Sequence, residues 1–135
     1  MALAGGGGAG NTVNPSGTGT SLNTIGDFAY AYSGIITVAN TAIPMLTFTT
    51  GNFIVDAKVQ FSCSTGTGDD FEYTVELDGQ EIYQMELSAP LQMRDLVDPI
   101  RLIIPPYSKV SVIIQNVSST TAVDHGTTLI GRVYA

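Results

Sequence analysis

The sequence is poor in the residues on which most enzymes and nucleic-acid-binding proteins depend. It has one histidine, one cysteine, no tryptophan, and five lysines and arginines against twelve aspartates and glutamates. The net charge of −7 disfavours phosphate backbones and anionic membranes, because binding to either needs clustered cations. No apolar run approaches the ~18 residues of a membrane-spanning helix. We therefore expect neither a nucleic-acid partner nor a membrane partner.

The single cysteine, Cys63, excludes a disulfide within one chain. It follows Phe61 at the two-residue spacing of a strand face, which favours a small buried side chain over a reactive thiol. Residues 1–5 have neither the positive nor the apolar region of a secretion signal, so the sequence predicts none there.

The single histidine, His125, argues against histidine-based catalysis. A Ser-His-Asp triad needs a carboxylate that orients the imidazole, and Asp124 would point elsewhere in an extended segment. No G-x-S-x-G elbow is present. We expect His125 in a loop, hydrogen-bonded or solvated, where it could titrate near neutral pH and loosen an interface in acid. The sequence predicts no enzyme and no cofactor.

Residues 1–26 are rich in glycine and polar residues and contain no charged side chain. Such a segment is a flexible coil when alone, because it has too little apolar surface to offset its ordering entropy. We interpret residues 1–26 as an arm that contacts neighbouring subunits, and residues 27–135 as the folded domain. The candidate contact residues in the arm are Gly5, Gly6, Gly7, Gly8, Asn11, Val13, Asn14, Leu22 and Ile25.

Eight segments between residues 28 and 135 have strand character. The clearest alternation runs from Phe53 to Phe61, where apolar residues alternate with polar ones. Asp78-Gly79 favours a two-residue hairpin, since a primed turn needs positive φ. Pro44 should place its strand at a sheet edge or at a bulge. Because no helix of ten residues fits between the segments, the sequence predicts an eight-stranded antiparallel jelly-roll sandwich with wider loops at 64–70, 88–98 and 118–126.

Acidic residues concentrate between Lys58 and Arg94, a stretch without any lysine or arginine. Hard oxygen ligands bind calcium, and the candidates here are Asp69, Asp70, Glu72 and Glu76. No D-x-D-x-D-G loop specifies the ion, however. The acidic face could instead meet a basic patch on a partner, or remain solvated and keep the protein soluble. If Asp78-Gly79 forms the hairpin, Glu81 could lie opposite the acids of the preceding strand.

The aromatic residues fall into two groups. Phe53, Phe61, Phe71 and Tyr73 lie at apolar positions of alternating strands, and we expect them in the core. A second group, Tyr30, Tyr32 and Tyr134, either packs inside or lines a subunit contact, where tyrosine is favoured.

Several segments resemble the globular heads of tumour-necrosis-factor-like and complement-type proteins. These segments are the strand Gly51 to Phe61, the hairpin Phe71 to Ile82, the turn and strand Pro105 to Val112, and the closing strand Thr128 to Tyr134. The same small jelly roll recurs in decoration, minor capsid and fibre-head proteins of viruses. The resemblance implies a trimer whose flat sides bury aromatic and aliphatic residues. Unlike the secreted heads, this chain has no collagen-like glycine repeat, which favours the viral group.

The sequence therefore predicts a homotrimeric structural protein of the virion. Its expected role is that of a capsid decoration, cement or minor capsid subunit, on the capsid surface or within the shell lattice. The arm would bind neighbouring capsid proteins. The alternative is a receptor- or glycan-binding head of a fibre or adhesin, which would use the loops at one end of the sandwich.

Overall fold

The computed structural model describes residues 21–63, 70–87, 98–118 and 122–135, and in these ranges the chain is all β. The strands are β1 (Asn23–Ile25), β2 (Phe28–Val38), β3 (Ile43–Thr49), β4 (Ile54–Cys63), β5 (Phe71–Leu77), β6 (Gln80–Leu87), β7 (Ile100–Ile104), β8 (Lys109–Asn116) and β9 (Val123–Tyr134). Within these ranges no helix is long and apolar enough to cross a membrane. The expected all-β architecture is confirmed.

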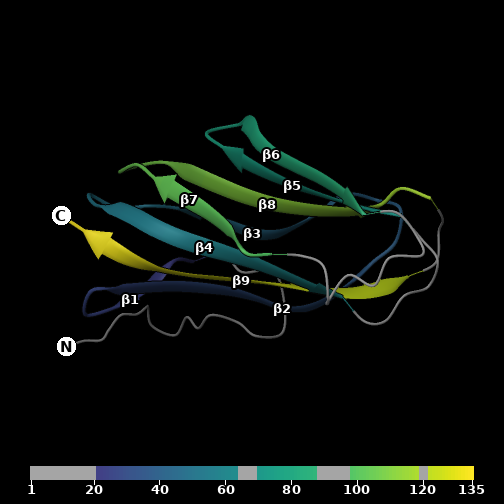
Figure 1. Ribbon diagram of the computed structural model, residues 1–135, viewed down its shortest axis with the longest axis horizontal. Helices are drawn as coiled ribbons and strands as arrows, with labels where there is room; N and C mark the ends of the chain where they lie inside the picture. The colour runs from purple at the N-terminus through teal and green to yellow at the C-terminus, as the bar shows by residue number, and fades with distance from the viewer. Residues whose placement is uncertain (1–20, 64–69, 88–97, 119–121) are drawn as a thin grey trace.

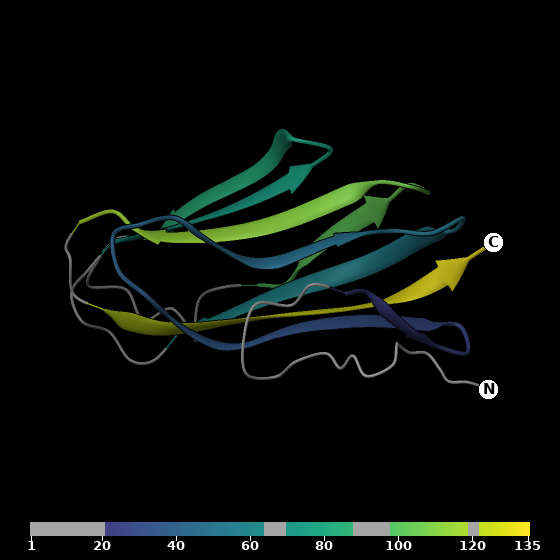
Figure 2. The same ribbon diagram turned by 180° about the vertical axis from the view of Figure 1, so that it is seen from behind.

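The strands form two antiparallel sheets that lie face to face. One sheet has the order β1-β2-β9-β4-β7 and the other the order β3-β8-β5-β6. Figures 1 and 2 show the two sheets as separate layers, with β5, β6 and β8 in one and β1, β2 and β9 in the other. The architecture is therefore that of a β-sandwich with a core between the layers.

The described residues form nine strands, whereas the sequence analysis predicted eight. The additional strand, β1, lies within the segment interpreted as the arm and pairs with β2, with Ile25 opposite Phe28. The two residues between them, Gly26 and Asp27, make a tight hairpin turn. Gly26 has φ of 57°, a value that glycine adopts without steric cost. A Gly-Asp pair is itself a hairpin signal, and it was overlooked in the sequence.

The predicted hairpin at Asp78-Gly79 is confirmed. It joins β5 to β6 with Leu77 opposite Gln80, and both turn residues have positive φ, 53° and 83°. This is the backbone of a primed turn, whose twist matches that of the flanking strands. The prediction for Pro44 is also confirmed, because β3 is an edge strand and its register shifts between Pro44 and Leu46.

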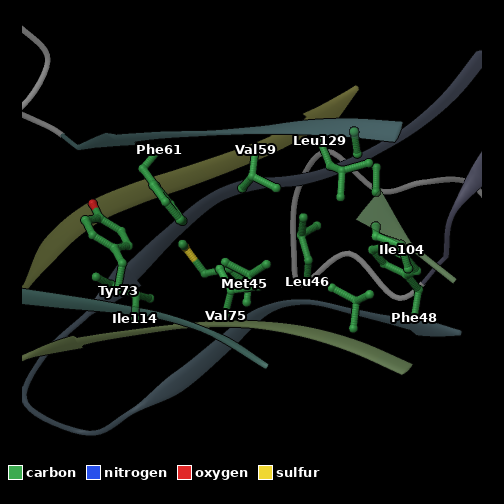
Figure 3. Close-up of a cluster of buried hydrophobic side chains, with 14 of the residues drawn as sticks. Met45, Leu46, Phe48, Val59, Phe61, Tyr73, Val75, Ile104, Ile114 and Leu129 are labelled. Carbon is green, nitrogen blue, oxygen red and sulfur yellow. The ribbon is translucent and has the colours of Figure 1, made fainter. Parts of the chain in front are cut away.

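The core consists mainly of aliphatic side chains from both sheets, with Phe61 and Tyr73 at one end and Phe48 at the other (Figure 3). Phe61, Phe71 and Tyr73 are buried as expected, and Phe53 is half-buried against the core. The Phe61 and Tyr73 rings stack across the two sheets with centroids 4.3 Å apart. Full burial of a large apolar side chain stabilises a fold by about 1.5–3 kcal/mol, so these contacts hold the sheets together. Cys63 packs partly against this core, and burial raises the pKa of its thiol.

Candidate assembly interface

The outer face of the β1-β2-β9-β4-β7 sheet exposes a group of large apolar side chains. They lie between inward-facing buried residues, as the alternation of a strand requires. Their exposed fractions run from 38% to 67%. They are Ile25, Phe28, Tyr32, Ile35, Ile54, Ile103, Ile130 and Tyr134, and together with the half-buried Tyr30 we call them the apolar face.

The strand register brings these side chains next to one another. Tyr30 of β2 lies opposite Ile130 of β9, and Phe28, two positions further along β2, lies opposite Arg132. At the other end of β9, Tyr134 lies opposite Ile54 of β4. The Tyr30 and Tyr32 rings are 5.4 Å apart between centroids. The apolar side chains therefore gather on this sheet face, with Arg132, Asp56 and Lys58 among them.

The candidate contact residues named from the sequence fall in three places. Tyr30, Tyr32, Tyr134 and Ile25 all belong to the apolar face. Leu22 packs partly against the core. The remaining candidates lie outside the described residues; they are Gly5, Gly6, Gly7, Gly8, Asn11, Val13 and Asn14.

Sequence reasoning missed the other members of the apolar face. Ile35, Ile103 and Ile130 each stand next to another apolar residue of the same strand, so the sequence does not say which of the neighbours faces outward. A usable signal was present in β2, where Phe28, Tyr30 and Tyr32 alternate with alanines. Where large aromatic residues alternate with alanines, the aromatics occupy one face of the strand and the alanines the other, which indicates a strand with two different apolar faces.

Charged groups on the apolar face occur in balanced pairs. Arg101 donates two hydrogen bonds to the Asp56 carboxylate, at 2.9 Å from Nε and 2.6 Å from Nη2. These bonds hold the pKa of Asp56 below its usual range. Arg132 lies 3.6 Å from Asp27 and places its guanidinium 5.3 Å from the centre of the Phe28 ring. Together with Lys58 and Asp124, the described residues of this sheet face comprise three cations and three acids, a net charge of zero.

The outer face of the other sheet is acidic. Cross-strand pairing places Glu72 opposite Glu86 and Glu76 opposite Glu81, which confirms the expected proximity of Glu81 to the acids of β5. Like charges directly opposite each other are unfavourable unless they are solvated or paired. With Asp78 added, this face carries five acids against one cation, Lys109. The two sheet faces of the molecule thus differ clearly in charge.

The calcium candidates are not gathered into a site in the described residues. Asp69 lies outside those residues. Glu72 and Glu76 share one side of β5, but four residues of strand separate them by roughly 13 Å, too far to share one cation. No group of three or more His, Cys, Asp or Glu residues that could hold a metal ion occurs in the part of the chain that the structure describes.

The expectation that His125 lies in a loop is wrong. β9 begins at Val123, earlier than expected, because Val123 pairs with Val38 and His125 pairs with Cys63. His125 is fully buried and its Nδ1 lies 2.9 Å from the Tyr73 hydroxyl. Asp124 faces the opposite way, and its carboxylate accepts a hydrogen bond of 2.6 Å from Thr37. The sequence analysis predicted that these two neighbours would not form a His-Asp pair, and in the structure they do not.

Comparison with known proteins matches no protein-family model, and no curated protein shows significant similarity to the chain.

Proposed function

We propose that this protein is a structural subunit that assembles with copies of itself through the apolar face. The observation that carries the proposal is the concentration of exposed apolar side chains on one charge-neutral sheet face. Soluble monomers rarely expose contiguous apolar patches larger than a few hundred Å², and larger patches mark interaction sites.

The size of the apolar face suits a stable interface. Three of the eight exposed side chains are aromatic, and with about half of each exposed they leave on the order of 300 Å² uncovered, since an aromatic side chain buries roughly 150–250 Å². The five isoleucines add to that area. A specific protein–protein interface buries about 800 Å² on each partner. The interface would also contain the aromatic residues and arginines that are enriched at interface centres.

The charge distribution favours a second copy of the chain as the partner. Two acidic molecules repel each other on approach, and the repulsion is strongest where both present the β5–β6 face. The apolar face has no net charge, so it is the side on which two copies can meet without that cost. Its flanking Arg101 and Arg132 also offer cations to acidic groups of a neighbour.

The proposed architecture is a jelly roll. Without β1, the sandwich has two four-stranded sheets in the orders β2-β9-β4-β7 and β3-β8-β5-β6. Strands that follow each other in sequence alternate between the sheets in most steps, and the first and last strands of the set are neighbours. This connectivity supports a jelly roll of eight strands, with β1 as an additional edge strand.

The proposed assembly is a homotrimer with a place in a virion. Its support is the resemblance of four segments to trimeric jelly-roll heads and to viral decoration proteins, together with a face that suits self-association. In this proposal the trimer is a decoration, cement or minor capsid subunit, and the part of the arm that precedes β1 reaches neighbouring capsid proteins. Three arms on one trimer bind as a multivalent unit, so individually weak contacts are sufficient.

The assembly proposal is tested by one substitution on the apolar face and one away from it. Ile130 lies within the face and is half exposed, so Ile130→Glu leaves the core intact but puts an unpaired charge into the interface. Val117 is similarly exposed but follows β8, away from the face, and Val117→Glu is the matched control. Sedimentation velocity at neutral pH should show a monomer for Ile130→Glu and an unchanged oligomer for Val117→Glu. An Ile130→Glu protein that keeps the mass of the wild type would contradict the proposal, provided that circular dichroism shows both variants folded.

A further inference from the structure

His125 lies inside the sandwich at a point where the two sheets touch. It belongs to β9, which lies in the middle of its sheet, and its backbone is paired with Cys63 of β4 and Ile36 of β2. Its side chain is fully buried and reaches the opposite sheet, where Nδ1 lies 2.9 Å from the hydroxyl oxygen of Tyr73 on β5. One imidazole therefore links the two layers through a polar contact in a mainly apolar core.

The second nitrogen of the ring has no such contact. His125 Nε2 has no hydrogen-bond partner in the described part of the chain and no accessible surface. A neutral imidazole tolerates this arrangement, since the other nitrogen is hydrogen-bonded to Tyr73. A protonated imidazole has two N–H donors and a full charge, and neither the charge nor the Nε2 donor has a partner among the described residues. Burying an unpaired charge in this way is strongly unfavourable.

Among the residues that the structure describes, the groups that face the ring offer no counter-charge inside the core. The Phe71 ring on β5 meets the imidazole edge to face, with centroids 4.7 Å apart. The neighbouring titratable groups are the Tyr73 phenol and the Cys63 thiol, and burial raises the pKa of both, so both stay neutral in acid. From β2 the neighbour is the apolar Ile36. Asp124 is charged and favours the protonated ring, but it lies on the other side of β9 and burial outweighs it.

Burial lowers the pKa of His125 from 6.5 to about 4. A histidine with a depressed folded-state pKa stabilises the fold fully above its unfolded pKa, near 6.5. That contribution is lost as the pH falls from 6.5 towards 4, because the unfolded chain takes up a proton that the folded chain refuses. Only the upper part of this window, from pH 6.5 to about 5, lies above the range in which most carboxylates titrate, so a variant that lacks the imidazole is needed as the reference.

We propose that His125 is an acid-sensitive contact between the two sheets, and that its protonation separates β9 from β5 and disturbs the adjacent part of the apolar face. Ile35 of that face pairs with Gly126, the residue next to His125, just beyond the register shift that follows Tyr32. Movement of β9 at His125 therefore reaches Ile35 and Tyr32 directly. An assembly that is stable near neutral pH would come apart in mild acid from this end. The link to disassembly rests on the proposed function, whereas the effect on the fold does not.

The test follows the single imidazole of the full-length chain. Because His125 is the sole histidine, its NMR signals titrate without overlap, and we expect a midpoint near pH 4. Urea unfolding of the wild type and of His125→Asn over the same range gives the effect on stability. Asparagine does not titrate there, and its side chain offers both a donor and an acceptor to the Tyr73 hydroxyl. Relative to His125→Asn, the folding equilibrium constant of the wild type should fall on the order of 100-fold between pH 6.5 and pH 4.

Asp124→Asn is the control for the neighbouring carboxylate and should keep the acid sensitivity of the wild type. An imidazole that titrates near 6.5 in the folded protein overturns the proposal, as does a His125→Asn protein with the same pH dependence as the wild type. If His125→Asn does not fold, the wild-type titration alone decides.

Light scattering along the same pH series tests the link to assembly. The wild-type mass should fall between pH 6.5 and pH 4, whereas the mass of His125→Asn should not. A wild-type oligomer that persists while His125 becomes protonated overturns the link. A chain that is monomeric at pH 7.5 contradicts the proposed function, and the His125 proposal is then decided by the titration and the unfolding data.

Discussion

Single residues decide which side of each strand is buried. In β2 the aromatic Phe28, Tyr30 and Tyr32 alternate with Ala29 and Ala31, and the alanines are the buried set. The alternation could be read from the sequence, but its direction could not, because the larger side chains would ordinarily be expected inside. The direction follows from the partners: Ala29 lies opposite Gly131, which in turn lies opposite Ala57. This row of small inward residues leaves the aromatic residues on the outside.

Gly131 should tolerate no side chain. A Cβ at this position would meet the carbonyl oxygen of Asp56 and would lie 2.8 Å from the Ala57 Cα, both of them backbone atoms of β4. We expect Gly131→Ala to lower the free energy of unfolding by about 1–3 kcal/mol, because β4 and β9 would have to move apart. Urea denaturation measures this change.

Gly126 provides the comparison on the same strand. There a Cβ would lie 3.1 Å from the Ser62 hydroxyl oxygen and 3.3 Å from the Ile35 Cδ1, both in side chains that can move. Gly126→Ala should therefore cost less than Gly131→Ala. Equal losses in the two variants would mean that β4 and β9 are not as tightly apposed as described.

Among the secondary-structure elements, turns with a strong sequence signal were predictable, whereas the ends of the strands were not. Asp78-Gly79 forms the predicted hairpin turn, and Pro44 lies at the predicted irregularity of its strand. β1 was missed because its three residues are too few for a periodic pattern. The beginning of β9 was missed because the residues from Val123 to Thr127 are all short or polar except Val123 itself. They form a strand because β2 and β4 on either side offer hydrogen-bonding partners, a tertiary effect that the segment alone does not encode.

The β5–β6 turn is stabilised by Asp78 in two ways. Asp78 adopts φ of 53°, which Asp and Asn accept more readily than most residues. Its carboxylate also accepts a hydrogen bond of 2.7 Å from the backbone amide of Lys109 at the start of β8. We expect Asp78→Ala to lose about 1–2 kcal/mol of stability, since both contributions disappear.

Asp78→Asn separates these contributions from the charge. Its side-chain carbonyl keeps the acceptor, and Asn-Gly is at least as favourable in a primed turn. The unfolding free energy should stay within about 0.5 kcal/mol of the wild type. If Asp78→Asn were as unstable as Asp78→Ala, the negative charge rather than the turn geometry would be the important property.

For the whole molecule, the main feature is the difference between the two outer faces. The net charge and the acidic stretch between Lys58 and Arg94 were evident in the sequence. The neutral apolar face was not, because its members come from five strands that only the sheet order β1-β2-β9-β4-β7 brings together. The three tyrosines named as either core or contact residues all belong to it. The composition thus suggested assembly, but the surface that would carry it depends on topology.

The central claim is that this chain is a subunit built for self-association through the apolar face. The most direct measurement is the mass of the full-length wild-type protein in solution at neutral pH, determined by light scattering over a range of micromolar concentrations. We expect the mass of three chains throughout that range. A protein that stays monomeric over the whole range would contradict the claim.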